Sequence, residues 1–370
     1  MKKDNLKLIV LESGKHLGTL VNEELKLIRN NPDGFIIEAN NPTFANSELN
    51  AVIEESVRGS DLFILADVGH HDIKYNYYGE ENRKSFNDHF MEILTMINAS
   101  ASTANRTWVI MPLLYASRQH KREKREALTC AMSLSILEHL GTKGIITFDV
   151  HDPAVRSALN RTSFDTIYTT NTMLDHLLDT ENIDFNKLLV VNPDAGATKR
   201  AHYFGRILEA PVGGFRKVRD TSKVVNGTCL IESHEYTGNV PLKDKNIIVV
   251  DDMIASGQSM IDVAKAAKDE GANKVYLFST FGLFSNGLSS VKLFDEAFEK
   301  KLIDKVYITN LSYIPEYIKQ KDWLEVVNCA PTLAQIISAL HDDESISQFM
   351  NGAEKITAKI KEKKLIHQKD

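Results

Sequence analysis

The sequence predicts an α/β protein with two tandem domains, each built on a parallel sheet flanked by helices. Short runs rich in β-branched residues alternate with longer stretches of helical spacing, and this alternation is typical of parallel sheets covered on both faces. The chain has 370 residues, which is longer than one typical domain. Its 43% of hydrophobic residues is enough to fill globular cores.

The expected strands are short apolar runs, and amphipathic stretches between several of them are the expected helices. The strand candidates are Leu6–Leu11, Leu62–Ala66, Trp108–Met111, Gly144–Phe148, Leu188–Val191, Ile247–Val250, Lys274–Ser279 and Lys305–Thr309. The helix candidates are Ala127–Leu140, Thr198–Leu208, Ser259–Glu270 and Thr332–Leu340.

A break near Asn160–Phe164 predicts a first domain over residues 1–160 and a second over 161–330. A segment at about 330–350 could pack on the first domain, and the charged tail at 351–370 is expected to form a solvated, partly frayed helix. His70–Asn87 is polar and aromatic without a period, so we expect a surface loop there. Lys217–Asn246 has few hydrophobic runs and is expected to form a mobile flap.

Charge and cysteine content exclude several classes of protein. A net charge of −6 and a pI near 6.1 argue against a general affinity for nucleic acid. Cys130, Cys229 and Cys329 lie far apart, which indicates buried thiols in a reducing compartment and neither a disulfide framework nor a zinc site. The start lacks an apolar signal core and no later run is apolar enough to span a bilayer, so we expect a cytoplasmic location.

One strand-to-helix connection contains residues suited to binding a phosphorylated sugar. The strand Ile247–Val250 is followed by two adjacent acids and then by small and polar residues that open an amphipathic helix. The acids could accept hydrogen bonds from a vicinal diol such as that of ribose, while backbone N–H groups at the helix N-terminus could hold a phosphate. The alternative is a simple turn in which Asp and Ser cap the helix. The residues expected to bind are Asp251, Asp252, Ser256, Gly257, Gln258 and Ser259.

Val250–Ser259 resembles the motif that binds phosphoribosyl diphosphate (PRPP) in type I phosphoribosyltransferases and in ribose-phosphate diphosphokinases, the PRPP synthetases. Only the synthetases carry a whole N-terminal domain that binds ATP, and the resemblance extends from about Leu6 to Phe349. It implies two phosphoribosyltransferase-like domains, the first binding ATP and the second binding ribose 5-phosphate.

The resemblance also implies a magnesium site. The family has an Asp-x-His element whose His is a magnesium ligand, and His151 stands at that place after the strand Gly144–Phe148. Asp194, in a Pro-Asp-x-Gly segment after Leu188–Val191, resembles the family's second ligand. A lone His after a strand is more often a hydrogen-bonded structural residue, so this assignment depends on the register of the two elements. The implied cofactor is Mg²⁺.

Two segments resemble the nucleotide-binding elements of the family. Phe44, Asn46 and Glu48 match its adenine loop, in which the aromatic ring stacks on the purine and the polar residues contact its edge. Arg118 and Gln119 match a second element, in which the guanidinium contacts ATP. The alternative for the second segment is a solvated basic face.

The catalytic pair implied by the family is a Lys-x-Arg on the segment after a strand of the second domain. Lys217 and Arg219 have that spacing, although a register that uses Arg216 stays open. Ala255 stands where the family usually has an acid, and His120 replaces an Asp after Arg118-Gln119. These departures put the nucleotide preference and the ribose contacts in doubt.

The resemblance therefore implies a ribose-phosphate diphosphokinase, which converts ATP and ribose 5-phosphate into PRPP and AMP. Two alternatives stay open. A phosphoribosyltransferase that consumes PRPP would leave the nucleotide elements without a role, and a catalytically weak, regulatory synthetase-like subunit is favoured only by the substitutions at Ala255 and His120. The family assembles as dimers or larger rings, so we expect a homo-oligomer, a dimer or a hexamer, with no nucleic-acid or membrane partner.

Overall fold

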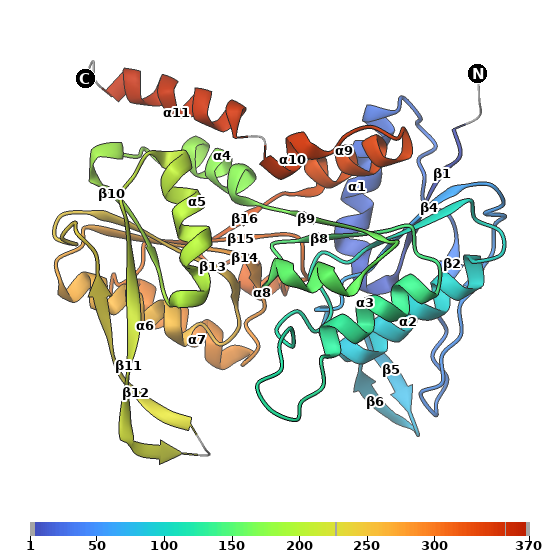
Figure 1. Ribbon diagram of the computed structural model, residues 1–370, viewed down its shortest axis with the longest axis horizontal. Helices are drawn as coiled ribbons and strands as arrows, with labels where there is room; N and C mark the ends of the chain where they lie inside the picture. The colour runs from blue at the N-terminus through green and yellow to red at the C-terminus, as the bar shows by residue number, and fades with distance from the viewer. Residues whose placement is uncertain (1–3, 226–227, 352, 368–370) are drawn as a thin grey trace. The chain divides into compact units, whose positions relative to one another are not determined.

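The computed structural model describes residues 4–225, 228–351 and 353–367, and it describes their side chains except for those of 217–234, 351, 366 and 367. The chain divides into two compact units (Figure 1). Unit 1 runs to Thr169 and also includes Asn310–Tyr313 and Asn328–Asn351, whereas unit 2 takes Thr170–Thr309, Ile314–Val327 and the residues after Asn351. The expected boundary at residue 160 falls inside unit 1, before its last strand.

Unit 1 is built on a five-stranded parallel sheet with the order β1-β4-β7-β8-β9. Every residue of β4 and β8 is buried, as expected for a parallel sheet covered on both faces. The strands are β1 (Leu6–Val10), β4 (Asp61–Leu65), β7 (Arg106–Ile110), β8 (Gly144–Phe148) and β9 (Ser163–Ile167). The helices are η1 (Glu12–Gly14), α1 (Lys15–Ile28), α2 (Phe86–Ser100), α3 (Thr129–His139), η2 (Pro153–Ala158), α9 (Ala330–His341) and α10 (Ser347–Asn351).

The C-terminal part of unit 1 returns to the beginning of the chain. Helix α9 packs against α1, and Arg29, just after α1, forms an ion pair with Asp342 at 2.8 Å and a hydrogen bond with Ser338 at 2.8 Å. His341 contacts Asp61 at the start of β4, with 2.9 Å between its Nδ1 and the carboxylate. Residues 328–351 therefore complete the first unit.

The segment expected to be an irregular surface loop contains regular structure. Strands β5 (Lys74–Tyr77) and β6 (Glu80–Arg83) form an antiparallel hairpin, and Tyr78 and Gly79 at its turn have φ of 48° and 91°. Such a pair of positive φ angles suits the right-handed twist of a two-residue hairpin. The expectation of a loop is wrong here because the hairpin is polar on both faces and shows no apolar alternation. A second small ladder pairs β2 (Ala39–Asn40) with β3 (Val52–Ile53).

Unit 2 holds a seven-stranded sheet with the order β12-β11-β10-β13-β14-β15-β16, in which only the β11–β12 pair is antiparallel. The strands are β10 (Leu188–Asn192), β11 (Val212–Val225), β12 (Thr228–Thr237), β13 (Asn246–Ile254), β14 (Lys274–Gly282), β15 (Lys305–Thr309) and β16 (Leu324–Val327). The helices are α4 (Thr170–Thr180), η3 (Phe185–Lys187), η4 (Ala195–Ala197), α5 (Thr198–Leu208), α6 (Gln258–Asp269), α7 (Leu288–Glu299), α8 (Glu316–Lys319) and α11 (Glu354–His367).

The segment expected to be a flap is a long ribbon. Strands β11 and β12 pair over most of their length, and Figure 1 shows the ribbon extending away from the rest of the unit 2 sheet. Sequence patterning missed these strands because their residues are mostly polar or charged. Within the described residues, most of the predicted flap therefore belongs to regular strands.

Two hydrophobic cores cover the two faces of the unit 2 sheet. Along β13, Ile247 and Val249 belong to one core together with residues of α6 and α7, whereas Ile248 and Val250 belong to the other together with residues of α4 and α5. This is the alternation that a strand imposes on successive side chains. The C-terminal helix α11 adds to the second core through Ile356, so it is not purely the solvated helix that was expected.

Within the ranges that the structure describes, no helix combines the length and the apolar character that crossing a bilayer requires.

Candidate active site

The strand order of unit 2 reverses between β10 and β13. These two strands are neighbours, but β11 lies beyond β10 and β14 lies beyond β13 on the opposite side. α/β folds bind ligands beyond the carboxyl ends of the strands at such a switch point. Asp194 follows β10, and Asp251 and Asp252 lie near the end of β13. The topology therefore brings three of the predicted site carboxylates to one edge of the sheet.

The acid pair lies inside the strand, whereas the sequence placed it in the following loop. β13 continues to Ile254, and Asp251 is in register with Ser279 of β14. Successive residues of a strand point to opposite faces, and accordingly Asp252 is buried while Asp251 is partly buried. The Asp252 N–H donates to Oδ1 of Asp251 at 2.9 Å. The two carboxylates therefore lie on opposite faces of the sheet and differ in their exposure.

Burial and the neighbouring charge of Asp252 raise the pKa of Asp251 to about 7, although the backbone N–H of Asp252 and the charge of Arg200 lower it. Arg200 lies on α5 and was not among the predicted site residues. A signal for it was present, since it is a basic residue shortly after Asp194 in the same segment. Its positive charge suits an edge that would receive an anionic ligand.

The connection between β13 and α6 forms a helix N-terminus beside the acid pair. Gly257 has φ of 88°, and a Cβ atom at this position would lie 2.3 Å from the ring of Phe294. Only glycine fits this turn without strain or displacement of the ring. The carbonyl of Ser256 accepts a hydrogen bond from Ser290 Oγ at 2.9 Å, which ties the loop to α7. The loop is thus held firmly by its surroundings.

Gln258 and Ser259 belong to the first turn of α6 and not to the loop. The side-chain Nε2 of Gln258 donates to Asp262 at 2.7 Å, so the amide is engaged along the helix surface. The backbone N–H groups of a first turn, together with the helix dipole, form a binding place for a phosphate.

Asp194 also has a structural role. Its Oδ1 accepts the N–H of Gly196 at 3.0 Å and caps η4, while Asn192 Nδ2 donates to its carbonyl at 2.7 Å. One carboxylate oxygen of Asp194 therefore caps a helix in this structure. A metal would have to use the second oxygen or share the first.

The Asp251 carboxyl gives a testable dependence of stability on pH. Because its pKa is raised from 3.8 to about 7 in the folded protein, the folded chain holds a proton that the unfolded chain releases. The stability from this carboxyl is present below pH 4 and is lost as the pH rises to about 7. Asp251→Asn is therefore expected to raise the free energy of unfolding at pH 8 by about 1–2 kcal/mol, a reduced value because the group is partly exposed.

Thermal melts at several pH values test this. The melting temperature of Asp251→Asn should exceed that of the unsubstituted protein by a few degrees at pH 8, and the gap should shrink towards pH 5. Asp269→Asn, at the exposed end of α6, is the matched control and should show no such trend. A gap that widens as the pH falls would contradict the assignment.

In unit 1, the loops after β7 and β8 lie at one edge because these strands are adjacent and parallel. Arg118 and Gln119 are exposed in the first loop, and His151 is exposed in the second. The rings of His120 and His151 are 5.2 Å apart, so the structure brings the two loops together. His120 Nε2 also lies 3.6 Å from Asp152. The two loops thus place a guanidinium, an amide, two imidazoles and a carboxylate at one edge.

Phe44, Asn46 and Glu48 form a tight exposed turn. The N–H of Phe44 donates to the Glu48 carbonyl at 2.7 Å, and Asn46 Oδ1 accepts the N–H of Glu48 at 3.2 Å. Phe44 is 54% exposed, which leaves its ring accessible for stacking. Among the described residues, no hydrogen bond joins this turn to Arg118 or Gln119.

Lys217 and Arg219 lie on β11, opposite His234 and Ile231, with a register shift between Val218 and Arg219. Their side chains fall outside the described residues. Arg216 is described, and its Nε donates to Glu235 across the ribbon at 2.7 Å.

The two predicted magnesium ligands belong to different units, His151 to unit 1 and Asp194 to unit 2. Magnesium prefers oxygen ligands and retains several waters, so a single carboxylate and ligand phosphates are a suitable donor set.

Comparison with known proteins identifies the family. Residues 6–141 match the family model of the N-terminal domain of ribose phosphate pyrophosphokinase, and residues 237–351 match that of the phosphoribosyl synthetase-associated domain. Ribose-phosphate pyrophosphokinase 2 of Schizosaccharomyces pombe is 31% identical over 84% of this chain and 88% of its own. The chain belongs to the ribose-phosphate pyrophosphokinase family.

Further members of this family match in the same way. The ribose-phosphate pyrophosphokinase of a Nostoc species is 30% identical over 83% of this chain and 84% of its own. The crystal structure of phosphoribosylpyrophosphate synthetase from Mycobacterium smegmatis covers 92% of this chain and 99% of its own, with a TM-score of 0.75 and 24% identity. This likeness confirms the predicted fold class, the two tandem phosphoribosyltransferase-like α/β domains.

Proposed function

We propose that this chain is a ribose-phosphate diphosphokinase, which transfers the β,γ-diphosphoryl group of Mg–ATP to the 1-hydroxyl of ribose 5-phosphate and yields PRPP and AMP. The structural observation that supports this proposal most directly is the acid pair beside a helix N-terminus at the switch point of unit 2. Family membership supports the proposal, because the relatives are named for this reaction and the match includes residues 6–141 of unit 1. A phosphoribosyltransferase would leave that matched region without a role.

Ribose 5-phosphate binds in unit 2. The first-turn N–H groups of α6 hold the 5-phosphate together with Ser256 and Ser259, and Asp251 and Asp252 orient the sugar hydroxyls. Holding the 1-hydroxyl in line with the β-phosphorus supplies much of the rate by positioning. Ala255 stands where the resemblance implies an acid, so Asp251 and Asp252 are the acids that orient the sugar here.

ATP binds in unit 1 through Arg118, Gln119 and the Phe44–Glu48 turn. The planar guanidinium of Arg118 suits phosphate oxygens, and the exposed ring of Phe44 suits a purine. His151 and Asp194 would hold Mg²⁺, which when bound neutralises charge on the triphosphate. Lys217 and Arg219 stabilise the charge that develops on the α-phosphate as its bond to the β-phosphorus breaks.

A coupled assay of the purified full chain tests the proposal. ATP, ribose 5-phosphate and Mg²⁺ should give AMP and PRPP in equal amounts, and omission of either substrate should abolish both products. Absence of product at every magnesium and phosphate concentration would overturn the proposal. Release of pyrophosphate from PRPP and a base would instead identify a transferase, and tight binding of both substrates without turnover would identify a regulatory subunit.

The proposal includes a cytoplasmic homo-oligomer, a dimer or a hexamer, without nucleic-acid or membrane partners. Sedimentation equilibrium of the purified chain measures the number of subunits in the oligomer directly. An active enzyme that is strictly monomeric would contradict the proposed oligomer.

A further inference from the structure

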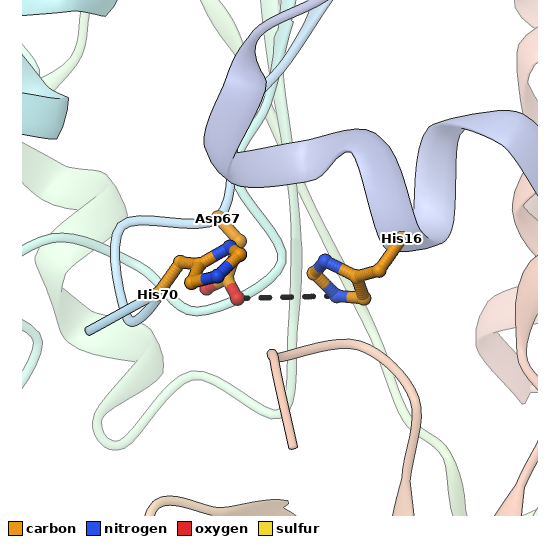
Figure 2. A group of neighbouring side chains, drawn as sticks. All are labelled: His16, Asp67 and His70. Atoms are coloured by element: carbon orange, nitrogen blue, oxygen red, sulfur yellow. Dashed lines mark ion pairs between the residues drawn. The ribbon is translucent and has the colours of Figure 1, made fainter. Parts of the chain in front are cut away.

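Three potential metal ligands from unit 1 converge outside the residues assigned above (Figure 2). His16 lies in the first turn of α1, and Asp67 follows β4. His70 begins the segment His70–Asn87, here called the inserted segment, which contains β5 and β6. One ligand atom from each of the three lies within 4.8 Å of the others, and His16 Nε2 is 3.9 Å from the Asp67 carboxylate. The fold thus brings His16 to Asp67 and His70, which lie three positions apart in the connection between β4 and β5.

The hydrogen bond that His70 makes is of the kind found at metal-binding histidines. Its Nδ1 lies 2.9 Å from the carbonyl oxygen of Ser13. A carbonyl only accepts, so Nδ1 carries the proton and Nε2 carries the lone pair. Histidines that bind metals usually donate their other N–H to a carbonyl or carboxylate in this way. Tyr313 stacks on the imidazole with ring centroids 3.9 Å apart, which fixes the plane of the ring.

Asp67 is a buried carboxylate held by neutral donors. It accepts the N–H of Gly69 at 2.8 Å, the N–H of Tyr313 at 2.6 Å and the hydroxyl of Ser312 at 3.0 Å. Among the described residues its nearest cationic partner is His16, which is charged only when protonated. A buried carboxylate is costly unless a cation compensates it. These donors fix the direction of the carboxylate. Because they are neutral, they do not compensate its negative charge, which a bound cation would do.

Hydrogen bonds and an ion pair from buried side chains also hold the loop that contains His70. His89 of α2 places its Nε2 2.8 Å from the His70 carbonyl and its Nδ1 3.0 Å from Glu92, which in turn pairs with Lys84. All three side chains are buried. Ligands fixed by such packing and hydrogen bonds lose little freedom when an ion binds.

We propose that His16, Asp67 and His70 form a binding site for a divalent transition-metal ion of the zinc type. Two imidazoles and one carboxylate make a donor set typical of Zn²⁺ and its first-row neighbours and unsuited to Mg²⁺, which takes oxygen ligands. With bonds of about 2.1 Å, tetrahedral donors lie about 3.4 Å apart, so binding draws the three side chains together by roughly 1 Å. A fourth position is left for water or an exogenous ligand.

The ion would clamp three segments of unit 1. His16 belongs to α1 and His70 to the inserted segment, while Asp67 is hydrogen-bonded to Ser312 and Tyr313 in the short stretch that returns to unit 1. Metal binding therefore stabilises the folded unit by the binding free energy that the unfolded chain lacks. This effect does not depend on turnover of any substrate.

The experiment uses the full chain, stripped of metal by a chelator and titrated with Zn²⁺ and, separately, Co²⁺. We expect one equivalent of each ion to bind, with a visible Co²⁺ absorption band and a higher melting temperature. His16→Gln and His70→Gln should each weaken Zn²⁺ binding at least tenfold, measured by competition with a chromophoric chelator. His71→Gln changes the exposed neighbour of His70 and is the matched control, with unchanged affinity.

Two further measurements locate the bound ion at these three residues. His151→Gln should retain the Zn²⁺ equivalent, which distinguishes this site from the one proposed for magnesium. Melts without metal show whether the glutamine variants fold, and the stoichiometry and Co²⁺ band of the unsubstituted chain test the site independently of them. No stoichiometric binding to the unsubstituted chain, or binding that survives both His16→Gln and His70→Gln, would overturn the proposal.

Discussion

Replacing Lys217 with alanine is expected to lower kcat for AMP formation by about 10²–10³-fold, the usual cost of removing one group that stabilises charge in a transition state. The proposed reaction moves negative charge onto the α-phosphate as AMP leaves, and we expect Lys217 on β11 to compensate this charge only while the bond breaks. The KM values for ATP and ribose 5-phosphate should therefore change much less than kcat. Steady-state rates of the coupled assay measure both.

Arg216→Ala is the matched control for this prediction. Arg216 lies on the same strand, but its guanidinium is paired with Glu235 across the ribbon. We expect its loss to change kcat less than threefold, since an exposed pair contributes little. A large effect of Arg216→Ala with a small one for Lys217→Ala would show that the alternative register is correct. Small and nearly equal effects of the two substitutions on kcat would show that neither residue of this ribbon takes part in catalysis.

The substitution Lys84→Met is expected to lower the free energy of unfolding by about 3 kcal/mol. Lys84 and Glu92 form an ion pair at 2.5 Å in which both side chains are almost completely buried, 6% and 2% exposed. Removing the lysine leaves a buried carboxylate whose remaining partner is His89, so the cost lies at the lower end of the range for broken buried pairs. Chemical denaturation of the full chain, followed by a probe in unit 1, measures the change.

The nearby pair between Lys74 and Glu81 provides the control, because it joins the same residue types at 2.7 Å but is 45% and 66% exposed. Lys74→Met should cost less than about 0.5 kcal/mol. The double variant Lys84→Met with Glu92→Gln should recover part of the loss, since it no longer buries an ionised group without its lysine. Equal costs for the two lysine substitutions would contradict the role of burial.

The fold was largely predictable because most strands are short apolar runs buried on both sides. β8 and β15 have the expected bounds, and α5 does as well. Several missed elements are stabilised by strand pairing more than by burial, although the partly buried strands β9 and β16 were missed as well. The β11–β12 ribbon and the β5–β6 hairpin are polar, and backbone hydrogen bonds define them without an apolar period.

A candidate site could be proposed from the sequence where its residues are contiguous, and its assignment stays a prediction. Asp251 and Asp252 were recognised from their position after an apolar run, although β13 extends past them and turns them to opposite faces. The cluster of His16, Asp67 and His70 could not be found by spacing. Its members come from α1, from the loop after β4 and from the inserted segment, and only the fold brings them together.

The discontinuity of unit 1 has a consequence for biosynthesis. Domains generally fold as units while the ribosome is still adding residues. Here, however, the donors Ser312 and Tyr313 for Asp67, and helix α9 with its His341 contact to Asp61, come after most of unit 2 in the chain. The nascent first unit must therefore wait for nearly the whole polypeptide before Asp67 gains its Ser312 and Tyr313 donors and Asp61 gains its His341 contact. An N-terminal fragment ending at residue 169 is expected to be a chaperone client and a protease substrate, not a stable domain.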